Sequence, residues 1–145
     1  MLAGIPPSRR KVAMPVYVES VTQPSPQDLT DLAKIYADAP EWLLTPYASA
    51  EALIAAALAD GSLIAGRFND RLLGAALLQR GDDAWRLSHL CVRKLTRKRG
   101  VGRRLLEETQ RQASEAGKPL RLAAPTGHLE ASALAARTHL PLDSL

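Results

Sequence analysis

Two glycines, Gly100 and Gly102, directly follow a run of basic residues, Arg97–Arg99. A strand-like apolar segment precedes the run and an amphipathic segment follows it, so the glycines stand where a helix begins. The first turn of a helix leaves N–H groups without partners inside the helix and carries a partial positive charge. Glycines let a ligand approach that backbone closely, and Lys and Arg surround it with charge. The pattern predicts an anion site that suits a pyrophosphate group.

A simpler interpretation of these residues is a helix start with a solvated basic face, because short glycine motifs recur by chance. The local charge favours a binding site. The segment from Arg86 to Arg111 holds nine Lys or Arg residues and two Glu residues, whereas the rest of the chain holds ten basic and thirteen acidic residues. A P-loop is excluded because no Gly-Lys-Ser/Thr follows, and a dinucleotide-binding motif is excluded because only two glycines are present.

Positive charge confined to one segment predicts one local anionic ligand rather than a nucleic acid. Nucleic-acid binders spread their charge over a whole face and add aromatic side chains that stack on bases. The chain has six aromatic residues, and none of them lies between Arg86 and Arg111. We therefore expect a small-molecule ligand and no nucleic-acid partner.

Few side chains are suited to acid–base chemistry near this motif. The strand-like segment 84–92 contains no Asp or Glu, and His89 is its weak catalytic candidate, because imidazole titrates near neutral pH. Strand alternation places residues 86, 88, 90 and 92 on one face and His89 with Cys91 on the other, unless a bulge intervenes. A hydrogen-bonded histidine within the sheet is the simpler interpretation. The catalytic residues, if there are any, stay unknown, and His128 and Glu130 are weaker candidates than His89.

The 145 residues, 46% apolar and 23% charged, suit one folded domain. The single cysteine excludes an intrachain disulfide and a cysteine-built zinc site, and we expect no metal. No apolar run approaches the about 20 residues that cross a bilayer. The first residues lack an apolar stretch of signal-peptide length. We expect a reduced, cytoplasmic protein without a membrane partner, in which residues 1–13 form a disordered tail and residues 14–145 one domain.

The N-terminal half is predicted to hold a strand, two helices and a hairpin. A strand-like run spans residues 16–21, and Ser25 and Pro26 are typical of a helix start. The apolar face of that helix is expected from residues at 3.6-residue spacing: Leu29, Leu32, Ala33 and Tyr36. A second helix is predicted from about residue 49 to residue 60. Two apolar runs, 62–68 and 71–79, are joined by Asn69-Asp70 and predict a β-hairpin.

The C-terminal half is predicted to hold a third consecutive strand at 84–92, the main helix at 100–116, a strand at 120–124 and a helix at 129–136. The main helix should bury one face, formed by Val101, Leu105, Thr109 and Ala113. Gly117 and Pro119 then end it. The resulting order, β-α-α-β-β-β-α-β-α, predicts the α+β class, with a mixed, mostly antiparallel sheet flanked by helices.

The segment V-R-K-L-T-R-K-R-G-V-G-R-R-L-L, Val92–Leu106, resembles the acyl-CoA pyrophosphate loop of the GNAT acetyltransferase superfamily, whose core is (R/Q)xxGx(G/A). The predicted element order is also that of the superfamily, so the resemblance covers essentially residues 16–140. Two blocks resemble the PanZ family more specifically: R-F-N-D-R-L-L at Arg67–Leu73 and T-R-K-R-G-V-G-R-R-L-L-E-E at Thr96–Glu108. PanZ proteins are acetyl-CoA-sensing partners of aspartate 1-decarboxylase (PanD), an enzyme of the pantothenate pathway.

The resemblance implies an acyl-CoA (N-acyltransferase) fold that binds acetyl-CoA or coenzyme A. The pantetheine arm would meet backbone groups at a strand edge, at Leu90, Cys91 and Val92. The pyrophosphate would be wrapped by the loop and helix start: Thr96, Arg97, Lys98, Arg99, Gly100, Val101, Gly102 and Arg103. Arg67 and Asn69 would lie on the hairpin that contacts the decarboxylase. Asn and Asp are also favoured in any tight turn.

Two functions follow as expectations. The first is a CoA-dependent regulator of the maturation and activity of aspartate 1-decarboxylase, and the alternative is an N-acetyltransferase that acts on a small amine or a protein amine. The missing acid–base pair favours the first, because amine acetylation needs a base and an acid. The C-terminal segment 128–145 lacks the aromatic-rich ending usual in the superfamily, which leaves the acyl-acceptor pocket undefined.

Overall fold

The computed structural model describes residues 16–95, 100–124 and 129–144, so the predicted tail at residues 1–13 lies outside the described residues. Within those ranges the chain forms six strands, four α-helices and one short 3-10 helix. In chain order these are β1 Tyr17–Ser20, α2 Pro26–Ala37, η1 Glu41–Leu44, α3 Ala50–Asp60, β2 Leu63–Phe68, β3 Arg71–Arg80, β4 Trp85–Val92, α4 Val101–Glu115, β5 Leu120–Ala124, α5 Leu129–Thr138 and β6 Leu142–Ser144.

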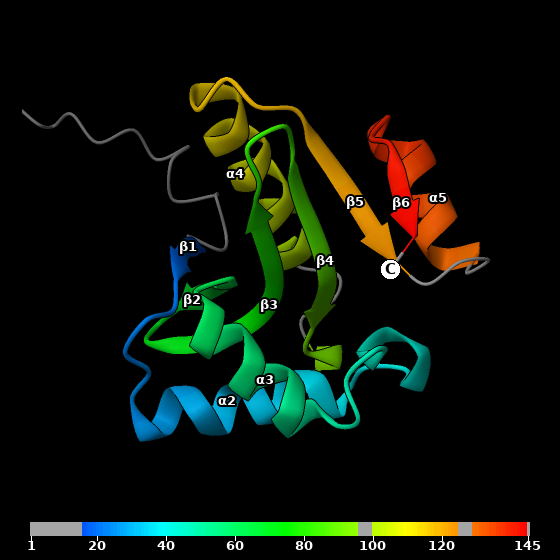
Figure 1. Cartoon of the computed structure of the whole chain (residues 1–145). Helices are drawn as coiled ribbons and strands as arrows, with labels where there is room; N and C mark the ends of the chain where they lie inside the picture. Colours follow the sequence, from blue (N-terminus) through cyan, green and yellow to red (C-terminus); the bar gives the residue numbers. More distant parts are fainter. Residues whose placement is uncertain (1–15, 96–99, 125–128, 145) are drawn as a thin grey trace, which may run out of the picture.

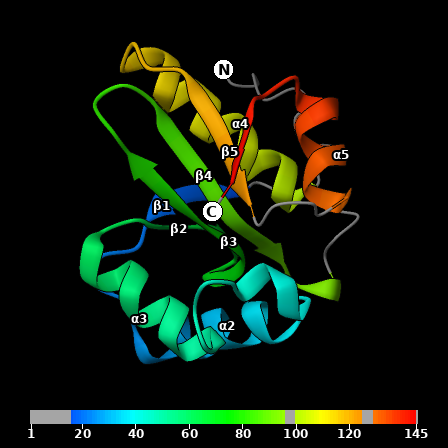
Figure 2. The same ribbon diagram turned by 45° about the vertical axis from the view of Figure 1, so that its right-hand side comes forward.

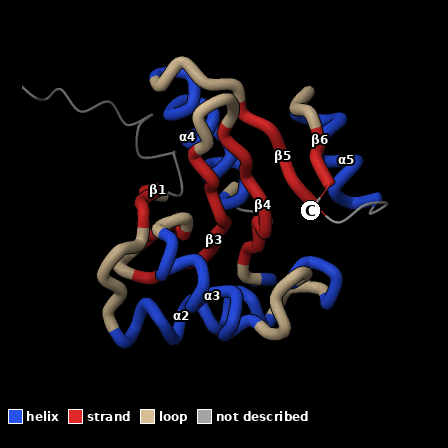
Figure 3. The backbone as a smooth tube through the Cα atoms, in the orientation of Figure 1, coloured by secondary structure: helices blue, strands red, loops and turns tan. Residues whose placement is uncertain are grey.

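The described strands form one mixed sheet whose spatial order equals the chain order, β1-β2-β3-β4-β5-β6 (Figures 1 and 3). The first four strands pair antiparallel, and β4–β5 and β5–β6 pair parallel. The Asn69-Asp70 turn joins β2 to β3, and both of its residues have positive φ, 48° and 64°, as a two-residue hairpin turn of type I′ requires. The expected α+β class and the hairpin are confirmed.

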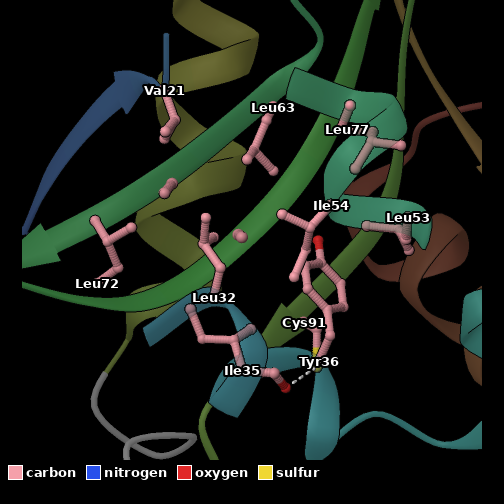
Figure 4. Packing of buried hydrophobic residues seen from close by; sticks show 13 residues of the cluster. Val21, Leu32, Ile35, Tyr36, Leu53, Ile54, Leu63, Leu72, Leu77 and Cys91 are labelled. Carbon is pink, nitrogen blue, oxygen red and sulfur yellow. Dashed lines mark hydrogen bonds between the residues drawn. The ribbon is translucent and has the colours of Figure 1, made fainter. Parts of the chain in front are cut away.

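Helices cover the two faces of the sheet in two layers. Figure 2 shows α2 and α3 on one side and α4 and α5 on the other. One buried cluster lies between the sheet and the α2–α3 layer, and Figure 4 shows its centre around Leu32, Tyr36 and Leu53. A second cluster lies on the α4 side and includes Val101 and Leu105. Among the described helices, none has the length and apolar character needed to cross a membrane.

Helix α2 begins as predicted but buries a different face. Ser25 caps it, and its hydroxyl accepts a hydrogen bond from the Asp28 amide at 3.0 Å. Leu29 and Ala33, expected inside, are exposed, and the buried residues of the helix are Asp28, Asp31, Leu32, Ile35 and Tyr36. The predicted apolar face is therefore confirmed for Leu32 and Tyr36 and wrong for Leu29 and Ala33, because the buried face is rotated about the helix axis. Two aspartates lie inside because arginines of the β2–β3 hairpin pair with them.

Helix α4 is the element that positions the expected anion site, and its buried face is confirmed. Val101, Leu105, Thr109 and Ala113 are each at most 1% exposed. The helix approaches the sheet where two strands carry glycine. A Cβ at Gly74 would lie 2.9 Å from Val101 Cγ1, and one at Gly66 would lie 3.4 Å from the same atom. A larger residue at Gly74 would push the start of α4 off the sheet, whereas one at Gly66 would first meet Val16 Cγ1, 2.9 Å from the Cβ position.

Two elements were not predicted from the sequence, η1 and β6. The strand β6 has three residues and follows Pro141, so its alternation is too short to be recognised. Two long-range ion pairs accompany its pairing with β5: Asp143 accepts hydrogen bonds from Arg86 and from Arg121. The single turn η1 lies between α2 and α3 and contains Trp42.

Candidate functional site: a cleft between diverging strands

Strands β4 and β5 separate toward their C-terminal ends (Figures 1 and 3). Their parallel pairing runs over three positions, from Trp85–Leu120 to Leu87–Leu122. Beyond Leu87 the described ladder between them stops, although β4 continues to Val92 and remains paired with β3. Strand edges present N–H and C=O groups that an extended, amide-bearing ligand can pair with. The divergence therefore opens the sheet at one place.

A cleft of about 640 Å3 occupies this opening, within the size range of small-molecule sites. Its walls come from η1 and the residue before it, from β4 and β5, from the start of α4, and from the C-terminal elements α5 and β6. The lining residues are Pro40, Trp42, Leu43, Leu87, Ser88, His89, Leu90, Cys91, Val92, Gly100, Gly102, Arg103, Leu122, Ala123, Ala124, Leu134, Arg137 and Leu142.

The start of α4 forms the polar part of the cleft. Gly100 is the N-cap residue, with a φ of 84° that glycine adopts without strain, and no side chain caps the helix. The first turn contains no acidic residue, and Arg103 is exposed and forms no ion pair with a described carboxylate. The N–H groups and the positive end of α4 thus lie at the cleft, where an anion would meet donors and positive charge.

The basic loop that leads into α4 is anchored at its first residues. Asp38, at the end of α2, accepts hydrogen bonds from the Arg93 side chain at 3.2 Å and from the Lys94 amide at 3.0 Å. Donation by that amide, opposed by slight burial and aided by Arg93, lowers the pKa of Asp38. Four predicted binding residues of the loop lie outside the described residues: Thr96, Arg97, Lys98 and Arg99.

Val101 and Gly102 contribute to the site in different ways. The Val101 side chain is fully buried against the sheet, so only its backbone can meet a ligand. Gly102 lines the cleft, and a Cβ there would contact Val92 Cγ2 at 3.4 Å. The two glycines therefore differ: Gly100 adopts a positive φ that favours glycine, whereas a Cβ at Gly102 would only touch Val92.

The predicted pantetheine residues, Leu90, Cys91 and Val92, all line the cleft along β4. Leu90 and Val92 are half-buried and pack on the α4 side. The Cys91 thiol points to the other face of the sheet, where it donates to the Ile35 carbonyl at 3.3 Å (Figure 4). Cys91 thus packs as a core residue at the back of the cleft.

Strand β4 carries a bulge at His89. Ser88 lies opposite Leu77 and Cys91 lies opposite Ala75, so two residues of β4 face one residue of β3. The φ of His89 is 54°, in the left-handed region. The bulge moves Ser88 to the face that Cys91 occupies, so the simple alternation expected for residues 86–92 is wrong beyond Ser88. The sequence analysis expected this alternation unless a bulge intervened, and the structure has that bulge.

His89 is buried, and both of its ring nitrogens have partners. Nε2 lies 2.8 Å from the Thr45 carbonyl oxygen, and Nδ1 lies 2.7 Å from Ser88 Oγ. Burial lowers the pKa of His89, and the Thr45 carbonyl partly opposes this effect. The Tyr36 hydroxyl donates to the His89 carbonyl at 2.8 Å, and the Tyr47 ring meets the imidazole edge-on. The histidine is thus held firmly, with its ring at the wall of the cleft.

The hairpin residues Arg67 and Asn69 are not part of the cleft lining. Arg67 is occupied within its own chain: it binds Glu19 at 2.9 Å and Asp28 at 3.0 Å, and its exposed fraction is 24%. Asn69 is exposed at the turn. The structure therefore separates the two predicted functional regions, and it gives Arg67 a structural role in the hairpin.

Sequence reasoning missed several walls of the cleft. Trp42 and Leu43 come from η1, and Leu134 and Arg137 come from α5. A Trp in a short segment between two predicted helices was the available signal for η1, and Trp42 is half-buried there. In the sequence, nothing distinguished Arg137 from an ordinary exposed charge on a helix. Among the described side chains, no group of three or more His, Cys, Asp or Glu residues could hold a metal ion.

Comparison with known proteins agrees with this geometry. A family model described as the acetyltransferase (GNAT) domain of PanZ matches residues 15–142. The PanD regulatory factor of Salmonella typhimurium strain LT2 is 38% identical over 87 residues. These residues are 60% of this chain and 60% of that relative, so the match spans less than two thirds of the relative's length.

Solved structures show the same fold at low sequence identity. The ribosomal-protein-S18-alanine N-acetyltransferase from Escherichia coli superposes with a TM-score of 0.64 at 20% identity, over 85% of this chain and 76% of that chain. The PaiA N-acetyltransferase from Thermoplasma acidophilum, solved in complex with coenzyme A, gives a TM-score of 0.61 at 14% identity, over 86% and 89% of the two chains. The diverging strands and the glycine-led helix thus occur within a fold that these acetyltransferases share, and the family match over residues 15–142 makes this chain a member of the PanZ family of GNAT domains.

Proposed function

We propose that the chain binds acetyl-CoA in the cleft between β4 and β5 and, with this ligand bound, regulates the maturation and activity of aspartate 1-decarboxylase (PanD). The observation that carries the first part is the position of the α4 N-terminus beside the diverging strands. The second part rests on membership of the PanZ family and on the relative named PanD regulatory factor.

The described residues fit the chemistry of coenzyme A. Its diphosphate would accept hydrogen bonds from the α4 amides after Gly100, with the Arg103 guanidinium adding charge. Its pantetheine amides would pair with the edge of β4 at Leu90–Val92, where β5 has moved away. The predicted loop residues Thr96–Arg99 would complete the diphosphate site.

The hairpin is the proposed contact with the decarboxylase. Asn69 is exposed at its tip, whereas Arg67 is bound to Glu19 and Asp28. We assign Asn69 the direct contact and Arg67 the role of holding the turn in place. Because the hairpin lies outside the cleft, the protein can hold its ligand and its partner at the same time.

The cleft favours regulation over acetylation of an amine. No Asp, Glu or Tyr occurs among the described residues that line it. The lone pair of the buried His89 on Nδ1 is taken by Ser88, so it has none free for an incoming ammonium group. The described walls therefore supply no base that is free to take a proton from an amine.

The test uses the purified chain and purified decarboxylase with and without acetyl-CoA. Thermal unfolding first measures ligand binding: at a hundred times its dissociation constant the ligand adds about 2.7 kcal/mol, which raises Tm by roughly 5–10 °C. Retention of the decarboxylase on the immobilised chain is then measured. We expect retention to increase when acetyl-CoA is present.

The two parts of the proposal fail separately. An unchanged Tm at millimolar acetyl-CoA contradicts the ligand. A raised Tm without retention of the decarboxylase contradicts the regulatory role and leaves the ligand in place. Release of coenzyme A thiol across a panel of amines, each at a rate that follows amine concentration, supports the N-acetyltransferase instead.

A further inference from the structure

A chain of three polar groups runs from the cleft wall into the protein interior. Ser88 Oγ lies 2.7 Å from His89 Nδ1, and His89 Nε2 lies 2.8 Å from the Thr45 carbonyl oxygen. A carbonyl oxygen can only accept a hydrogen bond, so Nε2 carries the ring proton. Nδ1 then has the free lone pair and accepts the Ser88 hydroxyl proton. The order is hydroxyl, base and orienting acceptor, which is the order that activates a serine nucleophile.

The imidazole is held in the neutral form that such a base requires. Burial lowers its pKa, and its exposed fraction is 5%. Its backbone is held at a φ of 54°, which is uncommon for a residue other than glycine. The Tyr36 hydroxyl bound to its carbonyl and the Tyr47 ring against its edge fix this conformation. Strain fixed in this way is concentrated at functional sites, and here it lies at the cleft.

The bulge also sets the direction of the Ser88 side chain. Opposite residues of an antiparallel ladder share a face, so Ser88 lies on the face of Leu77, toward the α2 and η1 side. Ser88 lines the cleft at the position where β4 leaves β5. Without the bulge, Ser88 would share a face with Leu90 and Val92 instead. The Ser88 hydroxyl and its base thus lie where the sheet opens between β4 and β5.

We propose that Ser88 is a nucleophile that accepts the acetyl group of acetyl-CoA, with His89 as its base. Ser88 Oγ bonds to the thioester carbonyl carbon while the carbon–sulfur bond breaks. The hydroxyl proton passes to His89 Nδ1 and then to the departing thiolate. The products are O-acetylserine at position 88 and free coenzyme A, so no further reactant is needed. This activity rests on the proposed binding of acetyl-CoA and goes beyond it, because no other partner is required.

The test is a mass-spectrometric peptide map of the full chain after incubation with acetyl-CoA and an acid quench. We expect one acetyl group on the peptide that contains Ser88, and hydroxylamine should remove it because it is an ester. Acetyl groups on lysine are amides and resist hydroxylamine. Excess coenzyme A without an acetyl group should suppress the Ser88 signal and leave lysine signals unchanged, since it competes for the cleft.

Three variants test the roles of Ser88 and His89. Ser88→Ala should abolish the ester, whereas Ser114→Ala, the same change at an exposed serine of α4, should leave it at the wild-type level. His89→Asn should slow ester formation at least about a hundredfold, the usual contribution of a general base. Asn is chosen because it tolerates a positive φ. Circular dichroism reports whether each variant is folded.

The outcomes separate this inference from the proposed function. A raised Tm with acetyl-CoA but no hydroxylamine-sensitive acetyl group at Ser88 overturns the nucleophile and leaves ligand binding intact. An ester that persists in excess coenzyme A overturns its origin in the cleft. An unchanged rate in folded His89→Asn overturns the base. If that variant does not fold, the competition experiment with the wild-type chain still decides whether the ester forms in the cleft.

Discussion

The hairpin end of the sheet and the cleft differ in whether their charged side chains are paired within the chain. On the hairpin side, Asp28 and Asp31 of α2 bind Arg67 and Arg71, one on each flank of the turn. On the cleft side, the first turn of α4 has no side-chain cap and no acidic residue, and the Arg103 side chain forms no ion pair with a described carboxylate. The first region satisfies its charges within the chain. The second has positive charge without a described partner, which suits the proposed anionic ligand.

This difference indicates which part of the protein is preformed. Asp31 is 1% exposed and accepts from the Arg71 side chain and from the Leu72 amide, so α2 and β3 are joined directly. The hairpin is therefore rigid before any partner arrives. At the cleft, a bound diphosphate would complete the capping of α4, so ligand binding there should stabilise the fold measurably.

The largest expected effect comes from Gly100→Val, which should abolish binding of acetyl-CoA. A β-branched residue is strained at a φ of 84°, and its side chain would stand over the N–H groups that the ligand needs. The ligand-induced rise in Tm of roughly 5–10 °C should disappear. The check is thermal unfolding with and without acetyl-CoA.

A matched control is available at the other end of α4. Gly117 has a φ of 72° and open space around its Cβ position, as Gly100 does, but it does not line the cleft. Gly117→Val should lower the stability of the ligand-free protein by a similar amount and retain the full ligand response. Equal loss of the ligand response in both variants would contradict the role of the α4 start.

The second effect tests the hairpin side. Asp31→Asn should destabilise the protein by about 1–3 kcal/mol, because it replaces a buried carboxylate that accepts from Gln27, Arg71 and the Leu72 amide. Burial opposes ionisation of Asp31, but the hydrogen bonds from Arg71 and Leu72 hold its pKa below the ordinary value. Its stabilisation is therefore present above about pH 4, the unfolded pKa, and is lost as pH falls through the lower folded value.

Urea unfolding between pH 7 and pH 2 measures both parts of this prediction. The difference between wild type and Asp31→Asn should be largest at neutral pH and should shrink in acid. Asp82→Asn, at an exposed turn, serves as the control and should match wild type throughout. A constant difference at every pH would mean that the Asp31 charge does not matter.

The third effect concerns the proposed partner contact. Asn69→Gly keeps a residue that adopts positive φ and removes the side chain, so the turn survives. Affinity for the decarboxylase should fall by about tenfold or more, as for an interface residue worth over 1 kcal/mol. Acetyl-CoA binding should not change. Asp70→Gly is the neighbouring control, and equal losses from both variants would point to the turn backbone rather than to Asn69.

The parts of the fold that local chemistry determines could be predicted from the sequence. Asn69-Asp70 favours a two-residue turn by itself, and the buried face of α4 repeats at regular spacing. The face of α2 could not be predicted, because Asp28 and Asp31 are neutralised by arginines 39 and 40 positions away. An aspartate on a helix is normally exposed, and only its distant partner explains its burial.

The same limit applies to the site. The types and spacing of the residues predict an anion site at Gly100, Gly102 and the basic run before them. The bulge at His89 depends on the Thr45 carbonyl, 44 positions earlier, and on Tyr36. Ser88 therefore had no signal in the sequence that separated it from any other strand serine. The walls from η1 and α5 were missed for the same reason, since each is contributed by a distant segment.

The smallest expected effect belongs to the edge of the sheet beside the cleft. Asp143 of β6 accepts hydrogen bonds from Arg121 and Arg86, which lower its pKa to about 2. This cluster is more exposed than Asp31, so solvent screens it and Asp143→Asn should cost less stability than Asp31→Asn. Its contribution is present above about pH 4 and is lost as pH falls toward 2, which urea unfolding can follow. Because β6 borders the cleft through Leu142, the variant should also weaken acetyl-CoA binding slightly, whereas Asp31→Asn should not. A larger loss of stability in Asp143→Asn than in Asp31→Asn would contradict the conclusion that the hairpin is held more firmly than the edge of the sheet beside the cleft.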